Sequence, residues 1–165
     1  MGKGTKITIS LPVIEKELSE KEITEIGENR IFSGKRILLV EDEPAISDVQ
    51  YRILTHEPCS HKVDVAANGQ AAIDLINRYE YDLVSLDFVL PDSITGMDVY
   101  NHIRENTQTL PVLFISGNLA FLESIKELKQ KDPLIDHVSK PCENKEYVRS
   151  INKLFRLGDD SSLLL

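Results

Sequence analysis

Acidic side chains lie at the ends of two short apolar segments of this sequence. Glu41 and Asp42 directly follow the segment 36–40. Asp87 lies in the segment 82–91, at the point where the apolar residues give way to an irregular loop. Three carboxylates at one point repel one another strongly unless a cation lies among them. Oxygen ligands suit a hard ion such as Mg²⁺, which takes one or two carboxylates together with phosphate oxygens and water.

Two further polar side chains also end apolar segments. Ser116 follows the segment 110–115, and Lys140 comes shortly after the segment 134–138. A lysine ammonium can pair with an anion, and a serine hydroxyl can donate a hydrogen bond to the same anion. A phosphoryl group on Asp87 would use all of these groups, because carboxylates are recognised nucleophiles that form aspartyl phosphates.

Each of these residues also has a purely structural interpretation. Asp87 could belong to a turn, and the acidic pair before Pro44 could favour a helix N-terminus electrostatically. Ser116 could cap a helix, and Lys140 could be a solvated lysine in a turn. All of these interpretations would have to hold at once, so the sequence favours a phosphoryl site.

From residue 35 onward, apolar strand patterns alternate with helical patterns. The predicted strands are 36–40, 62–66, 82–87, 110–115 and 134–138. The predicted helices are 44–56, 69–79, 97–105, 118–129 and 143–156. This alternation implies a parallel sheet with right-handed crossovers. We expect Ile46, Val49 and Ile53 to face inward from the first helix, and Tyr79 from the second.

The polarity of the strands predicts their order in the sheet. Segments 36–40, 82–87 and 110–115 are almost wholly apolar and should be central, because such strands are buried on both faces. The other two strands carry Asp64, Asp136 and His137 and should be edges. The order 2-1-3-4-5 satisfies this. The predicted fold is therefore a doubly wound, flavodoxin-like α/β sheet, whose ligand crevice lies between the ends of strands one and three.

Composition limits the classes of function. The chain has 165 residues, of which 41% are hydrophobic and 28% charged, and this suits one domain with appendages. Its net charge is −8 and it has no basic run, so we expect no direct contact with nucleic acid. No apolar run approaches membrane-spanning length. The two cysteines match no metal spacing, and a cytoplasmic location with reduced thiols is expected.

Residues 35 to about 156 resemble a response-regulator receiver domain. The resemblance rests on four pieces at the ends of four predicted strands: Glu41-Asp42, Asp87, Ser116 and Lys140-Pro141. It implies a two-component phosphorelay, in which a phosphoryl group passes from a histidine to a receiver.

The resemblance also implies a role for each site residue. Asp87 would accept the phosphoryl group. Asp42, helped by Glu41, would ligate Mg²⁺ together with Asp87 and the backbone carbonyl of Val89. Ser116 would move to the phosphoryl oxygens and Lys140 would pair with them. Receivers usually have a cis peptide bond after this lysine, so we predict a cis Lys140–Pro141 bond.

This sequence departs from the receiver pattern in two places. His137 lies where many receivers carry a switch aromatic residue, and it is either a variant of that switch or an ordinary edge-strand histidine. The loop 91–96 is one residue longer than usual.

The first residues have a different character. Residues 2–12 begin with glycines and then alternate in polarity, and they resemble the end of the ATP-binding domain of sensor histidine kinases. An ordinary N-terminal strand is the alternative. The predicted organisation is thus a kinase-like strand at 1–12, an acidic linker at 13–34, a receiver domain at 35–157 and a tail at 158–165. The parent chain would be a hybrid histidine kinase, a phosphotransferase with its receiver at the C-terminus.

The expected partners are the histidine of a kinase core or of a histidine phosphotransfer protein, with a second copy of the chain as a further candidate. Two other functions remain open. One is a pseudo-receiver that only binds a partner. The other is a small phosphatase or phosphotransferase with Asp87 as nucleophile, although Val89 stands where a second catalytic acid would be expected.

Overall fold

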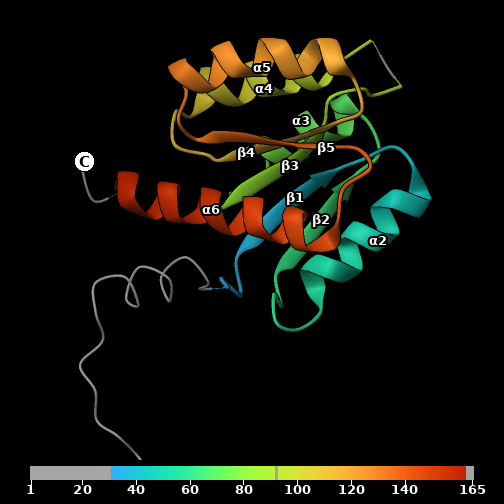
Figure 1. Cartoon of the computed structure of the whole chain (residues 1–165), viewed down its shortest axis with the longest axis vertical. Helices are drawn as coiled ribbons and strands as arrows, with labels where there is room; N and C mark the ends of the chain where they lie inside the picture. The colour runs from blue at the N-terminus through green and yellow to red at the C-terminus, as the bar shows by residue number, and fades with distance from the viewer. Residues whose placement is uncertain (1–30, 92, 163–165) are drawn as a thin grey trace, which may run out of the picture. The chain divides into compact units, whose positions relative to one another are not determined.

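Strands and helices alternate strictly along the chain (Figure 1). The structure is a computed structural model that describes residues 31–91 and 93–162. The strands are β1 (Arg36–Val40), β2 (Lys62–Ala66), β3 (Leu83–Asp87), β4 (Val112–Ser116) and β5 (Ile135–Ser139). The helices are α2 (Pro44–Thr55), α3 (Gly69–Ile76), α4 (Gly96–Asn106), α5 (Leu119–Lys131) and α6 (Asn144–Ser162). The predictions for residues 1–12 and for most of the linker lie outside the described residues.

The strands form one parallel sheet in the order β2-β1-β3-β4-β5, which confirms the predicted order. In the register, Val40 of β1 lies opposite Leu86, and Ser116 of β4 lies opposite Ser139. Because all five strands run the same way, their carboxyl ends meet at one edge of the sheet. Every residue of β3 and β4 is buried, as expected for central strands.

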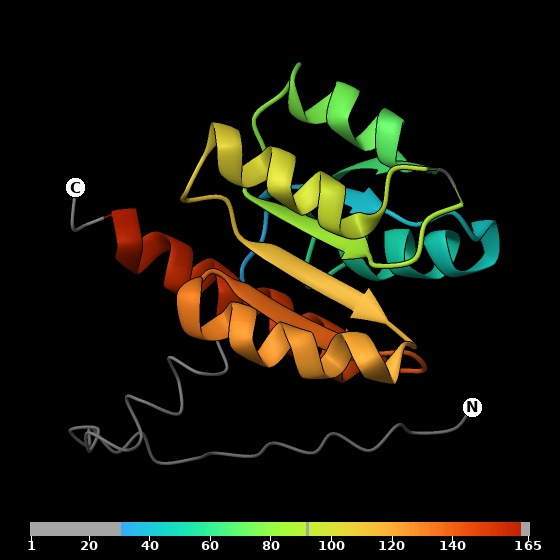
Figure 2. The ribbon, with the colours of Figure 1, turned by 90° about the horizontal axis from the view of Figure 1, so that it is seen from above.

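Helices cover both faces of the sheet, with α3, α4 and α5 on one face and α2 and α6 on the other (Figures 1 and 2). Each face has its own apolar core. Side chains of β3 alternate between the two cores, since Val84 and Leu86 pack toward α3, α4 and α5, whereas Leu83 packs toward α2 and α6. This double cover holds the carboxyl ends of the central strands in fixed positions.

Local signals place the start of the helices. Pro44 occupies the first turn of α2, where its missing N–H costs nothing. Asn68 caps α3 by accepting a hydrogen bond from the backbone N–H of Ala71. Thr95 and Asp98 form a reciprocal capping box at the start of α4.

The inward face predicted for α2 is wrong at Val49, although Ile53 is half-buried and packs against the core. The structure buries Ser47, Gln50 and Leu54, while Val49 is 51% exposed. The two stripes have nearly the same spacing and differ by one residue, which is a rotation of about 100° on a helix. Periodicity therefore indicates a helix here but does not fix which stripe faces the sheet.

Three other details differ from the predictions. Tyr79 lies beyond the end of α3 and is 45% exposed, with the guanidinium of Arg36 above its ring at 4.3 Å. Phe32, assigned to the linker, is buried and donates its backbone N–H to Asn152 Oδ1 at 2.8 Å. Helix α6 continues past the predicted end at Arg156, so part of the predicted tail is helical. Asp159 in this extension lies 3.3 Å from the ammonium of Lys35.

Within the described ranges, no helix has both the length and the apolar character needed to cross a membrane.

Buried histidine makes the stability of the fold depend on pH. His61 is 6% exposed and its Nδ1 has no hydrogen-bond partner among the described residues. Burial lowers the pKa of His61 below its usual value of about 6.5. Just below pH 6.5 the His61 imidazole is therefore protonated more readily in the unfolded chain than in the folded chain. The free energy of unfolding should fall as the pH drops below about 6.5.

We expect urea unfolding at pH 7.5 and pH 5.5 to show this loss, and His61→Phe to lose less stability than the wild type over the same interval. The comparison between variants matters because burial raises the pKa of Glu41, which acts in the opposite direction. An equal loss in both proteins would contradict the assignment to His61.

Candidate functional site

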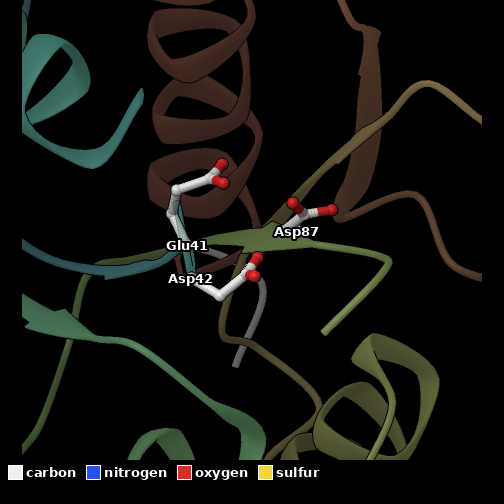
Figure 3. A group of neighbouring side chains, drawn as sticks. All are labelled: Glu41, Asp42 and Asp87. Carbon is white, nitrogen blue, oxygen red and sulfur yellow. The ribbon is translucent and has the colours of Figure 1, made fainter. Parts of the chain in front are cut away.

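Three carboxylates converge at the carboxyl edge of the sheet (Figure 3). Glu41 and Asp42 directly follow β1, and Asp87 is the last residue of β3. One oxygen from each lies within 4.8 Å of the others. Glu41 and Asp87 are buried, and Asp42 is half-buried. The neighbouring strands β1 and β3 therefore bring together the acidic residues that the sequence analysis singled out.

The ammonium of Lys140 lies among these carboxylates. Its Nζ is 2.6 Å from Asp87 Oδ2 and 2.8 Å from Glu41 Oε2. Lys140 follows β5, and its peptide bond to Pro141 is cis, as predicted. Counted as ionised groups, the three carboxylates and one ammonium carry a net charge of −2, so the site still attracts cations.

Burial and charge act against each other on the pKa values here. Burial raises the pKa of Glu41, and the hydrogen bond from Lys140 only partly offsets this. For Lys140 burial favours the neutral amine, but hydrogen bonds to Asp87 and Glu41 outweigh burial and raise its pKa. Lys140 is therefore a charged ammonium at neutral pH.

The backbone around Asp87 is tightly held. Asp87 Oδ1 accepts a hydrogen bond from the backbone N–H of Val89 at 2.9 Å. Gly96, the first residue of α4, packs so closely that a Cβ there would lie 2.5 Å from the carbonyl oxygen of Asp87. Only a glycine allows this approach.

Ser116 ends β4 and is buried at the same edge. Its Oγ accepts a hydrogen bond from the backbone N–H of Asn118 at 3.0 Å, and its carbonyl accepts one from the backbone N–H of Lys140 at 2.9 Å. The structure thus places Asp87, Ser116 and Lys140 at the ends of three adjacent strands. Their chemical roles stay predictions.

Residues 37–152 match the family described as the response regulator receiver domain. The chain belongs to this family. Transcriptional regulatory protein TcrA of Mycobacterium tuberculosis is 35% identical over 126 residues, which cover 76% of this chain and 48% of TcrA. Response regulator ArlR of Staphylococcus epidermidis is 30% identical over 128 residues, which cover 78% of this chain and 56% of ArlR. The receiver chain spans about half the length of these curated relatives.

Solved receivers have the same fold. The receiver domain of a sensor histidine kinase from Pseudomonas aeruginosa PAO1, solved with a magnesium ion coordinated in its active site cleft, is 27% identical with a TM-score of 0.62. The match covers 74% of this chain and 98% of that one. A CheY-like receiver from Methanospirillum hungatei gives a TM-score of 0.66 at 22% identity, covering 78% of this chain and 98% of that one.

The receiver's His137 lies on β5 opposite Phe114 of β4. It is half-buried, and its Nδ1 has no hydrogen-bond partner within the described part of the chain. Burial, together with the positive charges of Lys129, Lys126 and Lys153, lowers the pKa of His137 against the opposing effect of Asp136. The structure shows no contact between His137 and Ser116, so a switch role for His137 stays a prediction.

An apolar groove beside Lys140 was not predicted from the sequence. It lies between α2 and the start of α6 and has a volume of about 480 Å³. Its apolar lining includes Ile46, Val49, Ile53, Pro141 and Cys142. The α2 residues in this lining are the stripe that was expected to face the sheet. The polarity of α2 gave no signal for this groove, because two of the three residues that the helix buries, Ser47 and Gln50, are polar.

Proposed function

We propose that Asp87 of this receiver accepts a phosphoryl group from a phosphohistidine on a partner protein, in the presence of Mg²⁺. One observation carries the proposal. The buried carboxylate of Asp87 lies 2.6 Å from the Lys140 ammonium and within 4.8 Å of two further carboxylates. A cation and an ammonium on one side of a carboxylate would hold the oxygens of an incoming phosphoryl group.

The residues present fit a magnesium ion. Oxygen donors of net negative charge, held by a rigid sheet edge, are the ligand type that Mg²⁺ prefers. Glu41, Asp42, Asp87 and the backbone carbonyl of Val89 would hold it. Bound there, the ion would neutralise charge on the phosphoryl oxygens.

The chain's own residues would then carry the transfer. An Asp87 oxygen attacks phosphorus, and a new O–P bond forms as the P–N bond of the phosphohistidine breaks. The electron pair of the P–N bond returns to the imidazole nitrogen. The Lys140 ammonium and the Ser116 hydroxyl donate hydrogen bonds to the phosphoryl oxygens. Later attack by water on the acyl phosphate would release inorganic phosphate and restore the carboxylate.

A titration with Mg²⁺, followed by beryllofluoride, tests this proposal against a pseudo-receiver. Beryllofluoride mimics a phosphoryl group on a carboxylate. We expect saturable Mg²⁺ binding and beryllofluoride binding that needs Mg²⁺, with both lost in Asp42→Asn. Absence of both in the wild-type chain would contradict the proposal. Multiple turnover of a generic phosphate ester would instead indicate a phosphatase.

We propose that the phosphodonor protein docks at the apolar groove beside Lys140. The donor histidine must reach Asp87, so its protein has to cover the surface next to this site. Val49 is 51% exposed and lines this groove together with other apolar side chains, and a contiguous apolar surface of this kind can serve as a contact for a partner. The occupant we propose is a helix of a kinase core or of a histidine phosphotransfer protein.

Val49→Glu should therefore slow transfer from a phosphorylated histidine domain by about 10-fold, a typical loss for a central apolar contact. Uptake from acetyl phosphate should not change, because Val49 does not contact the reacting groups. Val65→Glu is the matched control, since Val65 is 44% exposed on β2 and does not line the groove. Equal effects of the two substitutions would argue against docking at the groove.

The placement of this receiver within a hybrid histidine kinase is also a proposal. It is supported by the resemblance of residues 2–12 to the end of a kinase ATP-binding domain and by the Pseudomonas aeruginosa neighbour, which is the receiver of a sensor histidine kinase. The curated relatives include transcriptional regulators, so the full protein could carry a different output.

A further inference from the structure

Phe88 lies between the two residues that carry the proposed chemistry of the β3–α4 loop, Asp87 and Val89. Its ring stacks on the ring of Phe121, with centroids 3.7 Å apart and planes 19° from parallel. Phe121 belongs to the first turn of α5 and is 4% exposed. It also packs edge-on against Phe114 of β4, with centroids 5.3 Å apart. The loop that follows Asp87 thus packs, through Phe88, against α5, a helix that supplies none of the proposed metal ligands.

The backbone of Phe88 is fixed on both sides of this ring. Its N–H donates to the carbonyl of Ile115 at 3.0 Å, and its carbonyl accepts from the N–H of Gly96 at 3.2 Å. β4, α4 and α5 therefore each hold one part of a single residue. Phe88 shares one peptide group with Asp87 and the next with Val89, whose N–H donates to Asp87 Oδ1 at 2.9 Å, so the position of Phe88 constrains the backbone next to both proposed ligands.

A second chain of contacts ties the same turn of α5 to the site. The Phe121 N–H donates to Asn118 Oδ1 at 3.3 Å, and the Asn118 N–H donates to Ser116 Oγ at 3.0 Å. The first turn of α5 is thus linked to the site through Phe88 and, separately, through Ser116.

We propose that Phe121 is a positioning residue, which sets the affinity of the site for Mg²⁺ through its stack on Phe88. The inference rests on the proposed function, because it concerns the ion of that site. Phe121 is not one of the proposed ligands and acts by holding the loop. Coupling of this kind is reciprocal, so whatever shifts the first turn of α5 changes ion affinity, and ion binding biases the position of that turn.

The test is a calorimetric Mg²⁺ titration of the whole chain. Phe121→Leu keeps an apolar side chain but loses the ring, and should weaken Mg²⁺ binding by about 3- to 10-fold, the range that one aromatic contact can supply. Phe88→Leu should weaken it equally. The double variant should be no worse than either single one, because both remove the same interaction.

Ile125→Val is the matched control. Ile125 is fully buried on the same helix and belongs to the same core, but has no ring to stack on Phe88. It should lower stability and leave Mg²⁺ affinity unchanged. An unchanged affinity in Phe121→Leu, or an equal loss in Ile125→Val, would overturn the inference and leave the proposed function intact. Absence of Mg²⁺ binding to the wild-type chain would overturn both.

Discussion

Asp87→Asn is expected to abolish phosphoryl uptake. After incubation with Mg²⁺ and acetyl phosphate, the wild-type chain should gain one phosphoryl group by intact mass, and the variant should gain none. Asparagine has nearly the same shape as aspartate. Its side-chain oxygen can still accept the hydrogen bond that the Val89 N–H donates to Asp87 Oδ1. The amide lacks the negative charge of a carboxylate nucleophile, so the fold should survive while the chemistry is lost.

Asp82→Asn provides the control for this experiment. Asp82 immediately precedes β3 at the opposite edge of the sheet, where its Oδ2 accepts the backbone N–H of Arg36 at 2.7 Å. This variant should gain the phosphoryl group as the wild type does. Phosphoryl uptake by Asp87→Asn at the wild-type level would show that another residue is the acceptor.

Lys140→Met should separate metal binding from phosphoryl transfer. The ammonium now pairs with Asp87 and Glu41, two of the carboxylates proposed to hold Mg²⁺. Its removal should therefore strengthen Mg²⁺ binding, because the ion no longer competes with a cation. Phosphoryl uptake from acetyl phosphate should nevertheless slow by about 100-fold, since a preorganised donor to the phosphoryl oxygens is lost.

These opposite effects are measurable by a Mg²⁺ titration and a time course of phosphoryl uptake on the same preparation. Lys153→Met serves as the control, because Lys153 pairs with Asp136 at 2.7 Å and touches none of the proposed site residues. If Lys140→Met weakened Mg²⁺ binding and phosphoryl uptake together, Lys140 would be holding the site's shape rather than acting on the phosphoryl group.

The sequence predicted the sheet and the convergence of the site for a simple physical reason. Parallel strands end at one edge, so a residue at a strand end needs no long-range information to be placed there. Polar residues on a strand, such as Asp64 and Asp136, mark the edges of the sheet. Asp87, Ser116 and Lys140 could therefore be brought together once the strand order was known.

Other features depend on contacts that sequence patterns do not encode. The polarity of α2 favours the apolar stripe through Val49 as its inward face, whereas the structure buries the stripe through Gln50, which tertiary contacts select. The stack between Phe88 and Phe121 joins a loop to a helix on another part of the chain, and no periodicity points to it. The extension of α6 is accompanied by long-range contacts, such as the ion pair between Lys35 and Asp159 and the packing of Leu157 against the core.

Direct identification of the modified residue tests the central claim most sharply. Borohydride reduces an aspartyl phosphate to homoserine, so the chain would be treated with Mg²⁺ and acetyl phosphate, reduced, digested and mapped by peptide mass. We predict homoserine at position 87 and at no other aspartate. Homoserine at a different position, or no reduced residue in a chain that also fails to bind beryllofluoride, would contradict it.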